Sequence, residues 1–342
     1  MSADNSCSDG SIPLRNLLNS VRCIRDRVKD GESNESDGEF NLPNFWDTLT
    51  QAAKATSQEA TKLSLAFSKP PLPSLQDGER LAESIQKTIL ALSTVYYWFP
   101  KSQGITLRRI IRDATAEVLD GVAQLIDVIL TSPLQSLSQE QLVSTGGVWS
   151  SCDHFAHLPK DNQEAVLSML ASYTGVVKDA IEEMEQAQTE SQDPFSDVLD
   201  DEELNSRGNQ DTYWSESDRQ LLAPCQGLMK ASAACLRKLS AAVRSNGKVD
   251  SPESIAQLDD LADIAKDISP SVDDLALSLY PPVDYSTVEL NACKLATVLK
   301  KVLEITRASH VCLEADQSWV EFLGGAVEHN LQKAKALTQG PS

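Results

Sequence analysis

The chain has 342 residues, with 50 acidic and 30 basic side chains, and carries a formal net charge of −20. Because a charge of this sign repels phosphate backbones, the composition predicts no direct nucleic-acid partner, and the length suggests two domains more readily than one. Hydrophobic residues make up 41% of the chain and aromatic residues only 5%, which allows a substantial core and favours helices packed through small side chains over a β-sandwich.

Apolar side chains recur every three or four residues in several segments, and each such stripe predicts one face of an amphipathic helix. In chain order the stripes cover residues 17–28, 46–67, 81–99, 107–129, 166–184, 222–243 and 288–302. No segment shows convincing period-two alternation between turn signals, so we predict no sheet. Long helices with mostly short connections are typical of up-and-down bundles, and we therefore predict an all-α fold.

Prolines and capping residues mark the ends of these helices. The stripes are separated by Pro70, Pro71, Pro73, Pro100 and Pro133. Capping boxes are predicted where a short polar residue is followed three positions later by an acidic one, at Asp161, Ser215 and Ser271. Pro224 lies early in its stripe, so that helix is expected either to start late or to be kinked.

One long acidic stretch, residues 182–218, interrupts the helical pattern. It loses its periodicity after Met184, and Arg207 is its only basic residue. We interpret this stretch as an acidic linker that joins two helical bundles. The predicted organisation is an N-terminal helix with an acidic loop (1–43), a first helical bundle (44–188), the acidic linker (189–214) and a second helical bundle (215–342).

Two serines in the acidic stretch are candidate regulatory phosphorylation sites. Ser196 is followed by Asp197 and Asp200, and Ser215 is followed by an acidic residue at the next position. Acid-directed kinases favour such surroundings, and a phosphate would add charge to a segment that is already negative. The alternative is a solvated linker with no regulatory role.

The segment LRRIIRDATAEVLDGVAQLIDVIL, residues 107–130, allows two interpretations. Its three arginines, Arg108, Arg109 and Arg112, precede an apolar stripe, as in a basic region that leads into a dimerisation helix. A DNA-binding basic region is a much longer run of basic residues, and here acidic residues follow at once. We therefore favour a core helix of a bundle with a solvated face, on which Arg109 and Asp113 can pair.

The segment CDHFAH gathers Cys152, His154 and His157. Structural zinc sites normally take four ligands in recognisable pairs, and no second pair lies nearby, so we predict no metal site. The sequence has no phosphate-binding glycine loop, no G-x-S-x-G motif and no H-E-x-x-H motif. We therefore predict no catalytic residues, no cofactor and no enzymatic activity, and partner-binding residues cannot be assigned from the pattern.

The cellular environment is indicated by two further patterns. The polar first residues, MSADNSCSDGS, do not form a secretory signal, and no apolar run approaches the roughly 18 residues of a membrane span. The chain has seven cysteines without C-x-x-C spacing. We expect them to be free thiols in a reducing compartment.

Several unusual strings in the sequence are similar to those of one protein family. They are YYWFPKSQGITLRRIIRDATAEVLDGVAQLIDV, NQDTYWSESD, AQLDDLADIAKDISPSVDDLALSLYPP, LKKVLEITRASHV, VVKDAIEEMEQA and LPKDNQEA. Together they span the chain from about Phe45 to the last helix, and they resemble the cyclin-D1-binding protein 1 (cyclin-D-interacting protein) family. The resemblance implies two helical bundles similar to talin- and vinculin-type domains.

The same resemblance implies a function. It implies an adaptor that binds D-type cyclin, restrains the cyclin D-dependent kinase, and so limits phosphorylation of the retinoblastoma protein and S-phase transcription. It also implies a leukocyte signalling adaptor of the Grb/Grap class and helix-loop-helix transcription factors as partners, and a location in cytoplasm and nucleus. The alternative function is a talin/vinculin-like cytoskeletal or signalling scaffold. An apolar stripe that is committed to an intramolecular core is not free to dimerise, which argues against simple helix-loop-helix pairing.

Overall fold

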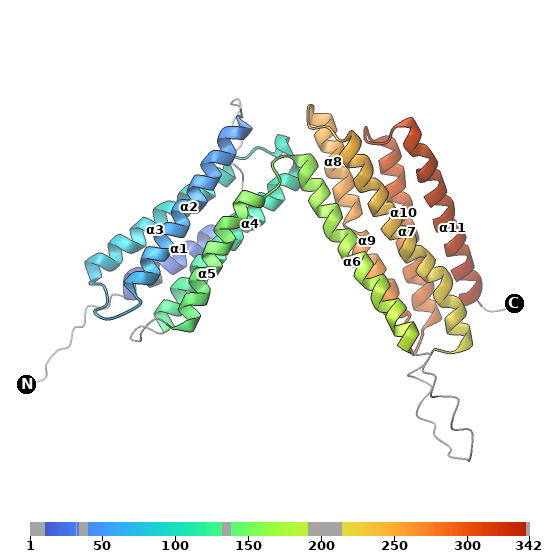
Figure 1. The fold of residues 1–342 in the computed structure, drawn as a ribbon, viewed down its shortest axis with the longest axis horizontal. Helices are drawn as coiled ribbons and strands as arrows, with labels where there is room; N and C mark the ends of the chain where they lie inside the picture. The colour runs from blue at the N-terminus through green and yellow to red at the C-terminus, as the bar shows by residue number, and fades with distance from the viewer. Residues whose placement is uncertain (1–10, 32, 34–39, 132–137, 191–213, 340–342) are drawn as a thin grey trace, which may run out of the picture. The chain divides into compact units, whose positions relative to one another are not determined.

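The computed structural model describes residues 11–31, 33, 40–131, 138–190 and 214–339. Helices are the only regular elements among these residues, which confirms the predicted all-α fold. The chain divides into two compact units, Met1–Asp161 and Asn162–Ser342, and each unit is a helical bundle (Figure 1). None of the described helices combines the length with the apolar character that a membrane span requires.

The first unit is a ring of helices. Its described α-helices are α1 (Ser11–Lys29), α2 (Leu42–Ala66), α3 (Leu75–Tyr97), α4 (Ile105–Thr131) and α5 (Gln139–His154), with the 3-10 helices η1 (Lys101–Gln103) and η2 (Phe155–His157). Helix α1 packs between α3 and α4, α5 packs between α4 and α2, and α2 packs on α3, which closes the ring. Helix α4 also contacts α2 and α3 across the ring, so it contributes to the bundle on several sides.

The turn from α3 into α4 follows from its sequence. Proline at position 100 lies beyond the end of α3, where its missing N–H and fixed φ prevent the helix from continuing. Gly104 has a φ of 118°, a value that side-chain-bearing residues rarely adopt. Glycine at this position therefore lets the chain reverse within a few residues, so that α4 starts at Ile105.

Helix α4 is a core helix of the first unit, as the sequence predicts. Its stripe is buried along its whole length, with exposed fractions of 5% or less at Leu107, Ile111, Ala114, Val118, Val122, Leu125 and Ile129. Burying a large aliphatic side chain contributes about 1.5–3 kcal/mol. The stripe is therefore fully used within the monomer, and none of it remains as a dimerisation surface.

The second unit repeats this plan. Its described helices are α6 (Asn162–Glu190), α7 (Glu216–Asn246), α8 (Pro252–Ala265), α9 (Ile268–Ser278), α10 (Tyr285–Ala308), η4 (Glu314–Asp316) and α11 (Gln317–Thr338). Helix α7 packs between α6 and α11, α11 packs on α10, and α8 and α9 follow one another between α10 and α6. Pro270 explains the break between α8 and α9, because it cannot donate a hydrogen bond to the carbonyl of Lys266.

The predicted domain boundary is wrong. Helix α6 packs against α7, α8 and α9, and its apolar stripe belongs to the core of the second unit. The units therefore separate between Asp161 and Asn162, and not between a bundle over 44–188 and another over 215–342. Loss of helical periodicity identifies a connection between helices but does not show which bundle buries each helix. The acidic stretch connects α6 to α7 within one unit, and residues 191–213 lie outside the described part of the chain.

The N-terminal helix predicted within 1–43 is α1, which packs on α3 and α4 and completes the first ring.

The capping box predicted at Ser215 is confirmed by reciprocal hydrogen bonds with Asp218. The capping box predicted at Ser271 is wrong, because Ser271 is buried within α9 and its hydroxyl donates to the Asp267 carbonyl at 2.7 Å. Helix α7 begins before Pro224, so the late start is also wrong.

Candidate interaction surfaces

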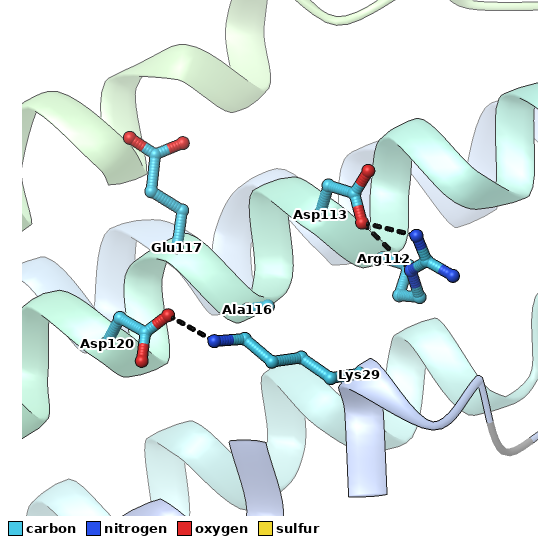
Figure 2. Close-up of a pocket in the computed structure, with 6 residues that line it drawn as sticks. All are labelled: Lys29, Arg112, Asp113, Ala116, Glu117 and Asp120. Atoms are coloured by element: carbon cyan, nitrogen blue, oxygen red, sulfur yellow. Dashed lines mark hydrogen bonds and ion pairs between the residues drawn. The ribbon is translucent and has the colours of Figure 1, made fainter. Parts of the chain in front are cut away.

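A charged groove lies between the end of α1 and the middle of α4. It has a volume of about 390 Å³ and is lined by Lys29, Arg112, Asp113, Ala116, Glu117 and Asp120. Figure 2 shows Lys29 of α1 extended toward Asp120 of α4, with Arg112 and Asp113 paired beside them. Asp120 accepts hydrogen bonds from Lys29 Nζ at 2.7 Å and from Arg25 Nη1 at 3.0 Å.

These ion pairs link α1 to α4 at the protein surface. Lys29 and Asp120 keep about half of their side-chain surface exposed, so each pair contributes only about 0–1 kcal/mol. The hydrogen bonds from Arg25 to Asp26 and Asp120 raise the pKa of the Arg25 guanidinium. Asp113 binds Arg112, its neighbour in sequence, at 2.8 Å. The groove thus holds fixed charges of both signs, which suits recognition of a charged partner segment better than chemistry on a small molecule.

Arg108 differs from Arg112 of the groove because it is buried. Its guanidinium donates to the carbonyl of Tyr96 at 3.3 Å and to that of Phe99, and it lies 4.5 Å from the centre of the Tyr96 ring. Burial raises the pKa of Tyr96, and the charge of Arg108 opposes this shift. The charge of Arg108 faces the carbonyl end of α3, where a cation is stabilising. The predicted solvated face is therefore wrong for Arg108.

The candidate metal ligands do not converge. The Cys152 thiol is buried, which raises its pKa to about 12, whereas His154 and His157 are exposed. Cys225 and Cys235 are also buried, and burial raises the pKa of each thiol to about 12. Among the described residues, no group of three Cys, His, Asp or Glu side chains lies close enough to hold a metal ion.

The two candidate phosphorylation sites have different positions. Ser196 lies outside the described residues. Ser215 is exposed, but its hydroxyl accepts the Asp218 backbone N–H at 3.1 Å and caps α7. Burial works to raise the pKa of Asp218, but hydrogen bonds from the Tyr285 hydroxyl and from Ser215 outweigh it and lower the pKa. Ser215 therefore belongs to a joint between the starts of α7 and α10, a role that its acidic surroundings did not indicate.

Exposed apolar side chains form the other candidate surfaces for partners. In the first unit, Trp149 of α5 is 45% exposed and its indole N–H donates to the Thr61 hydroxyl of α2 at 2.7 Å. Leu65 and Leu142 are also exposed on these two helices. In the second unit, Phe322 on α11 is 74% exposed. Apolar periodicity marks buried faces, so the sequence pattern gives no signal for these outward-facing side chains.

Comparisons with known proteins place the chain in a family. Residues 48–190 match the family model described as Grap2 and cyclin-D-interacting, N-terminal, and residues 199–304 match the corresponding C-terminal model. The chain is 66% identical to the cyclin-D1-binding protein 1 homolog of Danio rerio over 100% of both chains. The chain belongs to the Grap2 and cyclin-D-interacting family. This finding confirms the resemblance in the quoted strings.

Other members of the family are also similar along nearly their whole length. The cyclin-D1-binding protein 1 homolog of Xenopus laevis is 58% identical over 96% of this chain and 99% of its own. The human cyclin-D1-binding protein 1 is 46% identical over 95% of this chain and 93% of its own. The N-terminal family model ends at residue 190, at the end of α6, so its limit follows the sequence connection and not the packing of α6 in the second unit.

Proposed function

We propose that this protein is a non-enzymatic interaction protein that binds D-type cyclin. The observation that carries the proposal is its similarity, over the full length of both chains, to a relative named as a cyclin-D1-binding protein 1 homolog. Recognition by helical bundles uses exposed faces and grooves and needs no catalytic groups. The net charge of −20 favours basic surfaces on the partner.

By occupying the cyclin, the protein restrains the cyclin D-dependent kinase and limits retinoblastoma-protein phosphorylation and S-phase transcription. Such a role requires the protein in the cytoplasm and the nucleus. The family description mentions Grap2, which supports a signalling adaptor of the Grb/Grap class as a second partner. Helix-loop-helix factors are compatible partners only through an outer face, or after a helix has left its bundle, because the stripe of α4 is buried.

Direct binding to purified cyclin tests this proposal. We expect the full chain to bind D-type cyclin with a dissociation constant in the micromolar range or below, about −8 kcal/mol or stronger, by isothermal titration calorimetry. A cyclin of another class serves as the control. We further expect retinoblastoma-protein phosphorylation by the cyclin D-dependent kinase to fall in proportion to the bound fraction. Absence of binding at micromolar concentrations of both proteins would contradict the proposal.

A second candidate function is a cytoskeletal or signalling scaffold of the talin or vinculin kind. The observation that favours it is the arrangement of long helices in two bundles that share one plan. The acidic surface argues against binding to actin filaments, which are also acidic. Co-sedimentation with actin filaments at physiological salt distinguishes the two functions.

A further inference from the structure

Three segments of the second unit meet at His310. His310 lies in the connection that follows α10, Lys248 lies in the connection between α7 and α8, and Gln257 lies on α8. The backbone N–H of Lys248 donates to His310 Nε2 at 3.1 Å. The Gln257 side-chain oxygen lies 2.8 Å from both the backbone nitrogen and Nδ1 of His310. We call these three residues the His310 clasp.

The hydrogen bonds of the clasp fix the tautomer of the imidazole. A backbone N–H can only donate, so His310 Nε2 must be an unprotonated acceptor for Lys248. The backbone N–H of His310 likewise fixes the side-chain oxygen of Gln257 as the acceptor. Nδ1 must then carry the ring proton and donate it to the same oxygen. The observed geometry therefore requires a neutral imidazole with its proton on Nδ1.

We propose that His310 is a pH-sensitive clasp that joins the α7–α8 and α10–α11 connections when its imidazole is neutral and releases them when it is protonated. A proton from solvent forms a new N–H bond at Nε2 and takes up the lone pair that accepted the Lys248 N–H. Two N–H groups then face one another, and one of them has to move away. This role concerns the stability of the second unit and goes beyond cyclin binding.

The charged groups around the clasp shift the pKa of His310 in opposite directions. Burial and the positive charge of Lys248 favour the neutral ring and lower the pKa of His310, whereas Asp250 and Glu253 oppose them. The neighbouring end of α10 carries Arg307, and Asp316 at the start of α11 accepts a hydrogen bond from Asn246. The net direction is a pKa below the ordinary value of about 6.5.

The sign of the pH effect follows from this direction. An unfolded chain binds the proton at about pH 6.5, before the folded chain does. The stability contributed by the neutral clasp is therefore complete above about pH 6.5 and is lost as the pH falls toward the folded-state pKa. Each pH unit in that window changes the ratio of closed to open clasp by up to about tenfold.

A second set of hydrogen bonds, which does not involve His310, lies beside the clasp. The Asn246 side-chain amide donates to the Val311 carbonyl at 2.8 Å and to Asp316 at 3.3 Å, which links the end of α7 to the α10–α11 connection. Protonation of His310 is therefore expected to loosen this end of the bundle rather than to unfold the unit. The start of α6 lies at the same end, because Gln163 donates to the Val243 carbonyl at 2.8 Å near the end of α7.

Nuclear magnetic resonance of the full chain tests the proposal directly. The chain has four histidines, so the imidazole nitrogens of ¹⁵N-histidine-labelled protein are few enough to assign. We expect His310 in the Nδ1–H form at pH 7.5 and a titration midpoint below the ordinary value of about 6.5. We also expect amide exchange at Lys248, corrected for its intrinsic pH dependence, to rise by up to about tenfold per pH unit below 6.5. An Nε2–H tautomer, or a midpoint at or above 6.5, would overturn the proposal.

A matched pair of variants isolates the histidine. His310→Gln provides an oxygen that can accept the Lys248 N–H but does not titrate, whereas His329→Gln removes an exposed histidine outside the clasp. We expect the melting temperature of His310→Gln to change less between pH 7.5 and 5.5 than that of the wild type and of His329→Gln. Equal pH dependence in all three proteins would contradict the clasp. If His310→Gln does not fold, the titration of the wild type remains decisive.

Discussion

A fragment of residues 162–342 is expected to fold on its own, whereas a fragment of residues 191–342 is expected not to fold. The shorter fragment lacks α6, whose Val166, Leu170, Val177 and Met184 are fully buried in the core of the second unit. At about 1.5–3 kcal/mol for each side chain, their loss costs about 6–12 kcal/mol. That cost is comparable with the whole stability of a typical domain, about 5–15 kcal/mol.

Thermal unfolding followed by circular dichroism checks this expectation. Residues 162–342 should unfold in one cooperative transition, and residues 191–342 should show none and should bind a hydrophobic dye. Residues 1–161 serve as the matched control, because they contain α1 to α5 and should fold without α6. If residues 191–342 unfolded cooperatively at the melting temperature of the longer fragment, the result would contradict the packing of α6 in the second unit.

Replacement of Ile111 by Asp is expected to unfold the first unit while the second unit keeps its own transition. Ile111 is fully buried in the second turn of α4, so a carboxylate there would lie in the apolar core of the first unit. Loss of the buried aliphatic contacts and burial of a charge in an apolar core together cost more than about 4 kcal/mol. Differential scanning calorimetry of the full chain should show the transition of one unit lost and that of the other retained.

An exposed position provides the control for this variant. Val143 on α5 is 66% exposed, so Val143→Asp should change stability by no more than about 0.5 kcal/mol. Light scattering separates the two interpretations of the α4 stripe. If Ile111 formed a dimer seam, Ile111→Asp would convert a dimer into a folded monomer. We expect no such conversion, because Ile111 already packs inside its own bundle.

Helical periodicity predicted α1 to α4, α6, α7 and α10, because burial on one face leaves a direct record in the sequence, but it gave no stripe for α5, α8, α9 or α11. The stripes of α4, α7 and α10 are buried at every predicted position. Helix α5 has no such stripe, because much of its inner face is polar. Its Gln141 donates to the Ser64 carbonyl at 2.8 Å, and its Thr145 donates to the Ser64 hydroxyl at 2.8 Å. A buried polar seam of this kind has no apolar signature.

Tertiary arrangement was beyond the reach of the sequence pattern. An apolar stripe shows that a helix is buried but does not identify its neighbours, so the pattern cannot predict that α6 packs in the second unit. The sequence pattern also cannot predict the burial of Arg108, since an arginine beside an apolar stripe is normally solvated. Its burial depends on the carbonyls of Tyr96 and Phe99, which the fold places at the start of α4. The His310 clasp joins residues 62 and 53 positions apart, so no local motif could indicate it.

Hydrogen exchange of α4 in complex with D-type cyclin tests most directly whether the apolar stripes remain inside the monomer while the protein binds its partner. We expect amides of residues 107–129 to exchange slowly both in the free protein and in the complex, and protection to increase only on outward-facing segments. Loss of protection along α4 on binding would show that the helix leaves its bundle, and would contradict recognition by intact bundles.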